Sequence, residues 1–158
     1  MKNMMERNGL PKPIELGIDM DFYDKLKSDF PLMYEHGDIY VGEGWQPIIF
    51  ALSSCIQSHL NFVNRNSLEV AQVKVTQIKE KFGGLRFYYD GGDDYIDGLV
   101  RMAEAWADKT CEMCGKPGEK RGGGWIKTLC DEHDAERKSK YGFKQVSPVG
   151  STPDTKAV

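Results

Sequence analysis

Three stretches of the chain place hydrophobic residues every three or four positions, the spacing of a helix that packs one side against a core. They cover residues 21–29, about 45–63 and about 93–109. Pro31 ends the first stretch, and Pro47 suits the first turn of the second, where a missing N–H leaves no helical bond unmade. The pattern therefore predicts one short and two long amphipathic helices.

The hydrophobic stripes of the two long helices contain side chains that could serve either the core or a functional site. Cys55 and His59 lie on the stripe of the second helix, and Trp106 lies on that of the third. We interpret Cys55 as a small buried hydrophobic side chain. His59 is interpreted as a partly buried helix residue rather than a catalyst, and His36 is expected on a loop.

Residues 70–90 alternate between hydrophobic and polar side chains, which is typical of β-strands, and the pair Gly83-Gly84 lies between two such runs. Two glycines at this place are a signal for a two-residue hairpin turn. A turn centred on them pairs Lys81 with Arg86 across the hairpin, and the other pairs follow from it.

The two faces of this hairpin differ in chemistry, because successive strand residues point to opposite sides. The core face is expected to carry Ile78, Phe82, Leu85, Phe87 and Tyr89, with Glu80 as its odd member. The polar face carries Gln77, Lys79, Lys81, Arg86 and Tyr88. Val73 and Val75 have the parity of the polar face, so either a bulge shifts the register or both sides of that strand end are covered.

Three of the four cysteines lie near the C-terminus together with one histidine. Cys111, Cys114, Cys130 and His133 follow the pattern C-x2-C-x15-C-x2-H, a spacing typical of structural zinc sites. A disulfide is the alternative, and a reducing compartment disfavours it. Four protein ligands complete the coordination of one Zn²⁺ ion and leave no position for a catalytic water.

The order of elements around these ligands resembles a treble-clef zinc finger. A cysteine knuckle at 111–115 is followed by a turn-rich stretch, a short strand at 125–129 and a polar helix at 131–141. The predicted fold class is α+β: a small antiparallel sheet formed by the hairpin at about 70–90, packed helices, and this C-terminal finger. The predicted division is an α+β domain at 1–109, a zinc-finger module packed on it at 110–144, and a disordered tail at 145–158. A short strand is also expected at 14–20.

Composition limits the class of protein. The chain has 158 residues, 40% of them hydrophobic and 28% charged, with a net charge of −3. These values are ordinary for a globular protein and exclude wholesale disorder and a strongly basic nucleic-acid binder. No hydrophobic run reaches the roughly 18 residues of a membrane-spanning helix, and the first residues lack the apolar core of a secretory signal. We therefore expect a cytoplasmic protein with no membrane partner.

The polar hairpin face is the candidate binding surface. Its proposed residues are Lys79, Lys81, Arg86 and Tyr88, extended by Arg121 and Trp125 from the C-terminal finger. Cations and aromatic rings on one sheet face can bind phosphate and stack a base, which points to nucleic acid or a nucleotide. The alternative is a solvated sheet face whose lysines and arginine keep an edge soluble.

Motifs of known enzyme classes are absent from the sequence. There is no phosphate-binding G-x-x-x-x-G-K-[ST] loop, no H-E-x-x-H and no G-x-S-x-G. Three histidines, one of them assigned to zinc, leave little for acid–base catalysis. The remaining enzymatic hypothesis is a metal-dependent nuclease that uses acidic ligands such as Asp90, Asp93 and Asp94.

Three stretches together resemble a group of small, functionally uncharacterised proteins encoded by bacteriophages, prophages and bacteria. They are Gly44-Trp45 with the hydrophobic residues that follow, the hairpin sequence QIKEKFGGLRFYY at 77–89, and the Cys/His segment at 111–133. The resemblance covers about residues 40–135 and implies a bacterial cytosol and an accessory gene. Proteins of that kind often bind and redirect or inhibit host machinery, including antiviral defence.

The leading hypothesis from the sequence is thus a non-catalytic, zinc-stabilised binding protein of the phage-accessory kind that binds nucleic acid or a nucleotide through the basic and aromatic face. The alternative is a protein–protein interaction module, in which the finger and the helix beginning at Trp45 contact a host protein through apolar anchors. The sequence leaves the oligomeric state open.

Overall fold

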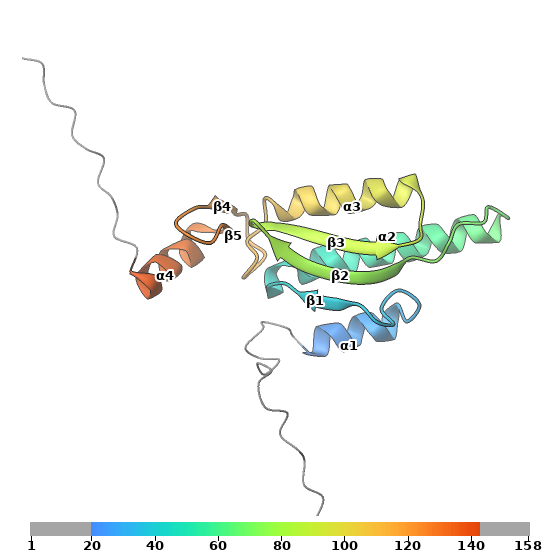
Figure 1. Ribbon diagram of the computed structural model, residues 1–158, viewed down its shortest axis with the longest axis horizontal. Helices are drawn as coiled ribbons and strands as arrows, with labels where there is room; N and C mark the ends of the chain where they lie inside the picture. Colours follow the sequence, from blue (N-terminus) through green and yellow to red (C-terminus); the bar gives the residue numbers. More distant parts are fainter. Residues whose placement is uncertain (1–19, 143–158) are drawn as a thin grey trace, which may run out of the picture.

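The computed structural model describes residues 20–142, so the strand expected at 14–20 and the tail expected at 145–158 lie outside the described residues, apart from Met20. The described chain has four α-helices, a 3-10 helix and five short strands (Figure 1). In chain order they are α1 (Met20–Asp29), β1 (Asp38–Tyr40), η2 (Glu43–Trp45), α2 (Gln46–Arg65), β2 (Lys74–Lys81), β3 (Gly84–Asp90), α3 (Asp94–Ala107), β4 (Glu119–Arg121), β5 (Lys127–Leu129) and α4 (Asp131–Tyr141).

The main sheet is mixed rather than purely antiparallel. Its strand order is β1-β2-β3, with β1 parallel to β2 and β2 antiparallel to β3. The α+β class is therefore confirmed, whereas the expectation of an all-antiparallel sheet is wrong. A parallel pair needs a long crossover, and α2 supplies it between β1 and β2 (Figure 1). With only three residues, β1 is too short to show an alternating pattern in the sequence.

The hairpin turn lies one residue earlier than the two glycines predict. Phe82 and Gly83 form the turn with φ angles of 52° and 72°, and Lys81 pairs with Gly84 rather than with Arg86. Two contacts fix it there: the Gly83 N–H donates to the Glu80 carboxylate at 2.6 Å, and Thr128 donates to the Gly83 carbonyl at 2.5 Å. Phe82 therefore leaves the predicted core face and is exposed in the turn.

The faces of the hairpin otherwise agree with the prediction, because the strand pairing shifts by two residues and a shift of two keeps each side chain on its face. Ile78 pairs with Phe87 on the buried side, and Lys79 pairs with Arg86 on the other. The ladder then passes directly from Val75 to Gln77, so the predicted bulge is confirmed. Because of that bulge, Val75 turns inward and is buried.

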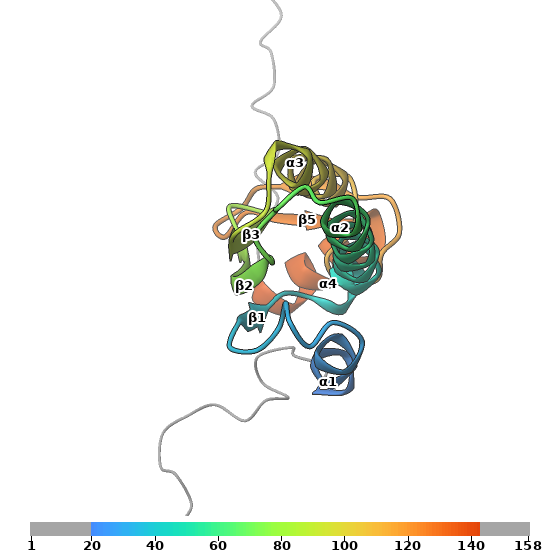
Figure 2. The same cartoon turned by 90° about the vertical axis from the view of Figure 1, so that its right-hand side faces the viewer.

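The core lies between the sheet and the long helices. Figure 2 shows α2 and α3 on one side of β2 and β3, and α1 beside α2 at the β1 edge. Phe30, just after α1, packs edge-on against Phe50 of α2 with ring centroids 5.5 Å apart. The largest fully buried side chains include Trp45, Tyr34, Leu26, Met33, Ile49, Ile56, Leu60, Ile78 and Leu85.

Two side chains on the predicted helix stripes are exposed, so the interpretation of Cys55 as a buried hydrophobic side chain is wrong. Cys55 is exposed, and Trp106 retains 65% of its accessible surface. Both line an apolar groove of about 350 Å³ between α2 and α3, together with Met102 and Ile48. The hydrophobic stripe of each helix is wider than the surface that contacts the core. The residues at the edge of each stripe therefore stay on the surface, where they line the groove. Among the described residues, no helix has the length and apolar character of a membrane span.

Candidate metal centre and basic sheet face

The first two candidate ligands lie on a tight knuckle at the end of α3. The Cys111 N–H donates to the Lys116 carbonyl at 2.8 Å, and the Gly115 N–H donates to the Cys111 carbonyl at 2.9 Å. Gly115 has a φ of 76°, a conformation that side chains rarely adopt. This turn aims the sulfurs of Cys111 and Cys114 in one direction.

The other two ligands come from the start of α4. Strand β5 ends at Leu129, and Cys130 then caps the helix with extended backbone angles while His133 lies in its first turn. The Cys130 sulfur and the His133 Nδ1 atom are 3.2 Å apart. Knuckle, β4–β5 hairpin and helix thus follow one another in the order that the sequence predicts (Figure 1).

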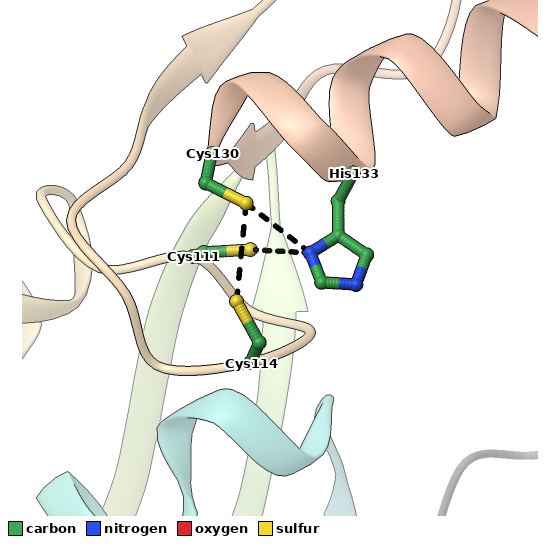
Figure 3. A group of neighbouring side chains, drawn as sticks. All are labelled: Cys111, Cys114, Cys130 and His133. Atoms are coloured by element: carbon green, nitrogen blue, oxygen red, sulfur yellow. Dashed lines mark hydrogen bonds between the residues drawn. The ribbon is translucent and has the colours of Figure 1, made fainter.

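The four ligand atoms form one compact group, with all of them within 4.8 Å of one another (Figure 3). A tetrahedral zinc ion with Zn–S bonds of about 2.3 Å and a Zn–N bond of about 2.0 Å would separate two sulfurs by about 3.8 Å, and a sulfur from the nitrogen by about 3.5 Å. The Cys114 and Cys130 sulfurs are 3.8 Å apart, and the Cys111 sulfur is 3.6 Å from His133 Nδ1. The cluster is therefore placed to bind one metal ion.

Two thiols of the cluster have pKa values shifted in opposite directions. The Lys116 N–H lowers the pKa of Cys114, but burial and the contacts with the Cys111 and Cys130 thiols outweigh it and raise that pKa above its ordinary value. Burial raises the pKa of the Cys111 thiol, but the backbone N–H groups of Cys130, Met113 and Cys114 donate to its sulfur and bring the pKa below its ordinary value. His133 presents Nδ1 to the sulfurs, and its Nε2 lies 4.0 Å from a Glu136 carboxylate oxygen.

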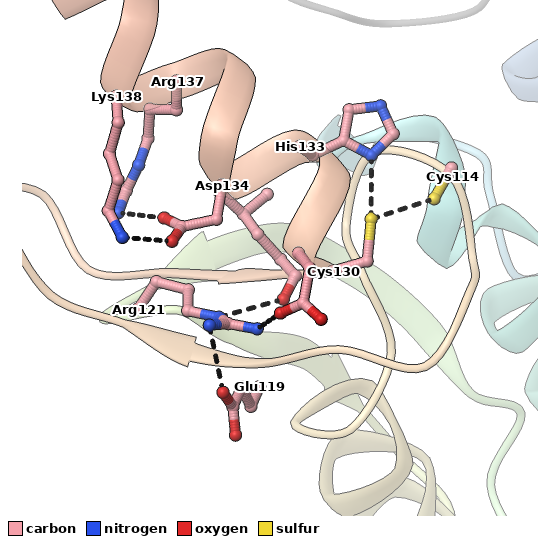
Figure 4. A network of polar contacts seen from close by, with 10 residues as sticks. Cys114, Glu119, Arg121, Cys130, His133, Asp134, Arg137 and Lys138 are labelled. Carbon is pink, nitrogen blue, oxygen red and sulfur yellow. Dashed lines mark hydrogen bonds and ion pairs between the residues drawn. The ribbon is translucent and has the colours of Figure 1, made fainter.

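Ion pairs join β4 to α4 and connect residues within α4 beside the cluster (Figure 4). Arg121 contacts Asp131 at 2.5 Å and Glu119 at 3.1 Å, so its guanidinium is engaged within this part of the chain. The buried Asp134 carboxylate receives both Arg137 at 3.0 Å and Lys138 at 2.7 Å, and these cations lower its pKa, the lysine most strongly. These pairs are structural ties rather than a free basic surface.

The C-terminal module, here residues 110–142, packs closely on the rest of the chain. Trp45 is fully buried and donates its indole N–H to the Thr110 carbonyl at 2.8 Å. The Gly44 N–H donates to the Glu112 carbonyl at 2.9 Å. A Cβ on Gly44 would lie 2.1 Å from the Cys111 carbonyl oxygen, so only glycine fits against the knuckle here.

The sheet side away from α2 and α3 carries the predicted basic residues. Because Ile39, Ile78 and Phe87 form one buried row, the next row along the strands, Tyr40, Lys79 and Arg86, points outward. The outer sheet face is defined here as Tyr40, Gln77, Lys79, Lys81, Arg86 and Tyr88, with Asp38 as its acidic neighbour. Figure 2 shows no helix of the described chain over this side of β2 and β3.

Within this face, Lys79 lies over the Tyr88 ring at 5.3 Å from its centroid. The Arg86 guanidinium instead turns toward α3, where it lies 4.0 Å from Glu104, and it donates to the Leu85 carbonyl at 2.6 Å. Tyr40 is 39% exposed and Tyr88 is 41% exposed. Tyr40 was not among the predicted residues, because only the pairing of β1 with β2 brings it beside Lys79.

The predicted binding residues do not form one site. Arg86 and Tyr88 lie on β3 and line neither of the two hollows described next. Lys79, Lys81 and Trp125 line one cleft of about 510 Å³ together with Glu80, Phe82, Gly124 and Ile126. We call it the Trp125 cleft. Arg121 instead faces α4, beside Asp131 and Asp134. Asp93, one of the acidic residues considered for a nuclease, caps α3 and contacts His59 at 2.8 Å.

Fold and site together define a small α+β protein with a Cys₃His cluster placed to bind one metal ion. Among the described residues, these four side chains are the one set close enough together to bind a metal ion. Asp90, Asp93 and Asp94 do not form a second set. Comparisons with protein-family models, with curated proteins and with solved structures found no match.

Proposed function

We propose that this protein is a zinc-stabilised binding protein that holds nucleic acid on its outer sheet face. The ligand set supports zinc: three thiolates and an imidazole suit a structural tetrahedral site, and four protein ligands fill it. Zinc would fix the start of α4 to the knuckle after α3, and the module has little apolar core of its own, with only Cys111, Leu129 and Cys130 in its buried cluster. The ion therefore serves the fold rather than a reaction.

The observation that carries the binding proposal is the outward row Tyr40–Lys79–Arg86, next to Tyr88, on a sheet side that no helix within residues 20–142 covers. Lysine and arginine neutralise phosphates, and exposed aromatic rings stack with bases. A solvated sheet face needs no aromatic residues, and here two tyrosines flank the cations. The resemblance of three stretches to phage and bacterial proteins supports an accessory role in the bacterial cytosol, where such a protein would inhibit or redirect host machinery such as antiviral defence.

The test is a titration of the purified, zinc-loaded protein with fluorescein-labelled oligonucleotides at several salt concentrations. Three phosphate contacts would weaken binding roughly 20- to 40-fold between 50 and 200 mM salt. The double variant Lys79→Glu, Lys81→Glu should abolish binding, whereas Lys25→Glu, a change at an exposed lysine on α1, should not. Binding that ignores both salt and the double variant would overturn the proposal.

A second candidate function, a protein-interaction module, is favoured by the apolar groove between α2 and α3. Met102 and Trp106 are 61% and 65% exposed along it, and Gly115 of the knuckle lies at its end. Trp45, expected to be part of such an interface, is instead buried under Thr110. A bacterial protein captured after nuclease treatment, and lost with Trp106→Ala, would support this candidate over nucleic-acid binding.

A further inference from the structure

Hydrogen bonds from α4 hold the loop at 122–126, which carries Trp125, although the loop contains several glycines. Arg137 of α4 donates to the Gly122 carbonyl at 2.8 Å and to the Trp125 carbonyl at 2.9 Å. The Arg137 side chain is only 12% exposed and is itself held by Asp134 (Figure 4). A buried, paired arginine with two loop carbonyls as acceptors gives this loop one conformation.

The indole ring at the tip of this loop is exposed and yet anchored. Trp125 is 70% exposed, and its Nε1 donates to one Glu80 carboxylate oxygen at 2.9 Å. The other oxygen of Glu80 accepts the Gly83 N–H of the hairpin turn at 2.6 Å. An exposed aromatic ring held at its backbone and at its edge loses little freedom when a ligand stacks on it, which is the property of a preorganised binding site.

The surroundings of the ring indicate what the ligand is. Phe82 and Ile126, 68% and 40% exposed, line the same cleft as Trp125 and supply apolar surface. Lys79 and Lys81 line it as well and supply positive charge. A volume of about 510 Å³ falls within the usual range of small-molecule sites. A flat ring with an attached anion fits this lining, and a nucleotide has both parts.

We infer that the Trp125 cleft stacks an unpaired base of single-stranded nucleic acid on the Trp125 indole, with the adjoining phosphate near Lys81. Lys79 belongs both to the cleft and to the outer sheet face, so one strand can pass from the face into the cleft. The bases of a double helix are stacked inside it and cannot reach the indole, so the cleft selects single strands. This inference rests on the proposed function of the outer sheet face.

The experiment compares the affinity of the zinc-loaded protein for single-stranded DNA, single-stranded RNA and a duplex of the same sequence. Trp125→Ala should weaken single-strand binding by roughly 5- to 150-fold, the range that one stacked base contributes. Trp106→Ala is the matched control, since this second exposed tryptophan lies in the groove between α2 and α3 and outside the cleft. Phe82→Asn is a further variant that keeps the turn, because asparagine tolerates the φ of 52° at this position.

The outcomes separate the two proposals. A preference for single strands that Trp125→Ala or Phe82→Asn removes, and Trp106→Ala does not, supports the inference. Equal binding of duplex and single strand, unchanged by Trp125→Ala but lost with Lys79→Glu, overturns the inference and leaves the proposed function in place. No binding to any of the three nucleic acids overturns the proposed function, and the inference with it. Equal losses of DNA and RNA binding would show that the cleft ignores the 2′-hydroxyl.

Discussion

Replacing Gly44 by alanine tests the contact between the C-terminal module and the rest of the chain. The added Cβ would lie 2.1 Å from the Cys111 carbonyl oxygen and 2.5 Å from the Gly115 backbone nitrogen. Both are backbone atoms of the knuckle, so no side-chain rotation relieves the overlap. Because non-bonded heavy atoms settle near 3.5 Å, the knuckle must move away by about 1 Å.

A movement of that size affects two hydrogen bonds at the contact. These are the bond from the Gly44 N–H to Glu112 at 2.9 Å and that from the Trp45 indole to Thr110 at 2.8 Å. The second is buried, and an unmade buried bond costs about 1–3 kcal/mol. Overpacking adds about 1–3 kcal/mol. The free energy of unfolding should fall by roughly 2–6 kcal/mol, a large part of the roughly 5–15 kcal/mol of a typical domain.

The measurements are urea unfolding at pH 7, thermal unfolding, and the zinc content of the purified variant. We expect a lower urea midpoint and a melting temperature lower by about 10 °C or more. Gly98→Ala is the matched control: a Cβ at Gly98 in α3 meets nothing within 4 Å, and alanine in a helix interior should stabilise by roughly 0.5–1 kcal/mol. If Gly44→Ala unfolds within about 2 °C of the unmodified protein and retains its metal, the close contact at the knuckle does not exist in solution.

Three further predictions concern the metal, a helix cap and a buried ion pair. Chelation should remove one zinc ion per chain and unfold α4, seen as lost helical circular dichroism; undiminished helicity would contradict a structural role. Asp93→Ala should lower the free energy of unfolding by about 1 kcal/mol at neutral pH, because it removes the cap of α3. Since His59 lowers the pKa of Asp93, this difference from the unmodified protein should shrink in urea unfolding as the pH falls below about 4. Lys127→Met should destabilise by about 1–3 kcal/mol, because burial raises the pKa of Glu112 and Lys127 is its ion-pair partner; adding Glu112→Gln should recover part of the loss in urea unfolding.

The ligands of the metal centre could be predicted from the sequence because their geometry is local. Each pair, Cys111 with Cys114 and Cys130 with His133, is fixed by one turn of backbone, and the spacing reports that turn directly. Helix bounds were also predictable within a few residues, since α2 and α4 extend over many residues of consistent pattern. Alternation alone also assigned the faces of the hairpin between Gln77 and Lys81 and along β3, but not the inward turn of Val75 or the exposure of Phe82.

The position of the hairpin turn could not be predicted in the same way, because long-range contacts decide it. Thr128, 45 residues further along the chain, donates to the Gly83 carbonyl, and a Cβ at Gly83 would lie 3.0 Å from Ile126. A local turn preference cannot include partners that only the folded module supplies. For the same reason, the pattern of α3 could not show that Trp106 lies in a groove instead of the core, nor could it place Tyr40 beside Lys79.

Residues from three distant parts of the chain, Gly44, the hairpin at 77–89 and the Cys/His segment at 111–133, meet at one place in the fold. Gly44 contacts the knuckle, Gly83 accepts from Thr128, and Glu80 accepts from Trp125. Residues that are far apart in sequence therefore serve one junction between the sheet and the C-terminal module.

This junction links the Cys₃His cluster to the proposed binding surface through a chain of contacts. The cluster fixes the first turn of α4, α4 positions Arg137, and Arg137 holds the carbonyl of the residue whose indole lines the cleft. A metal ion at the cluster would thus determine the affinity for a stacked base without touching it. Because Trp106 lies outside this chain of contacts, loss of the metal should weaken binding in the cleft even where the groove between α2 and α3 stays intact.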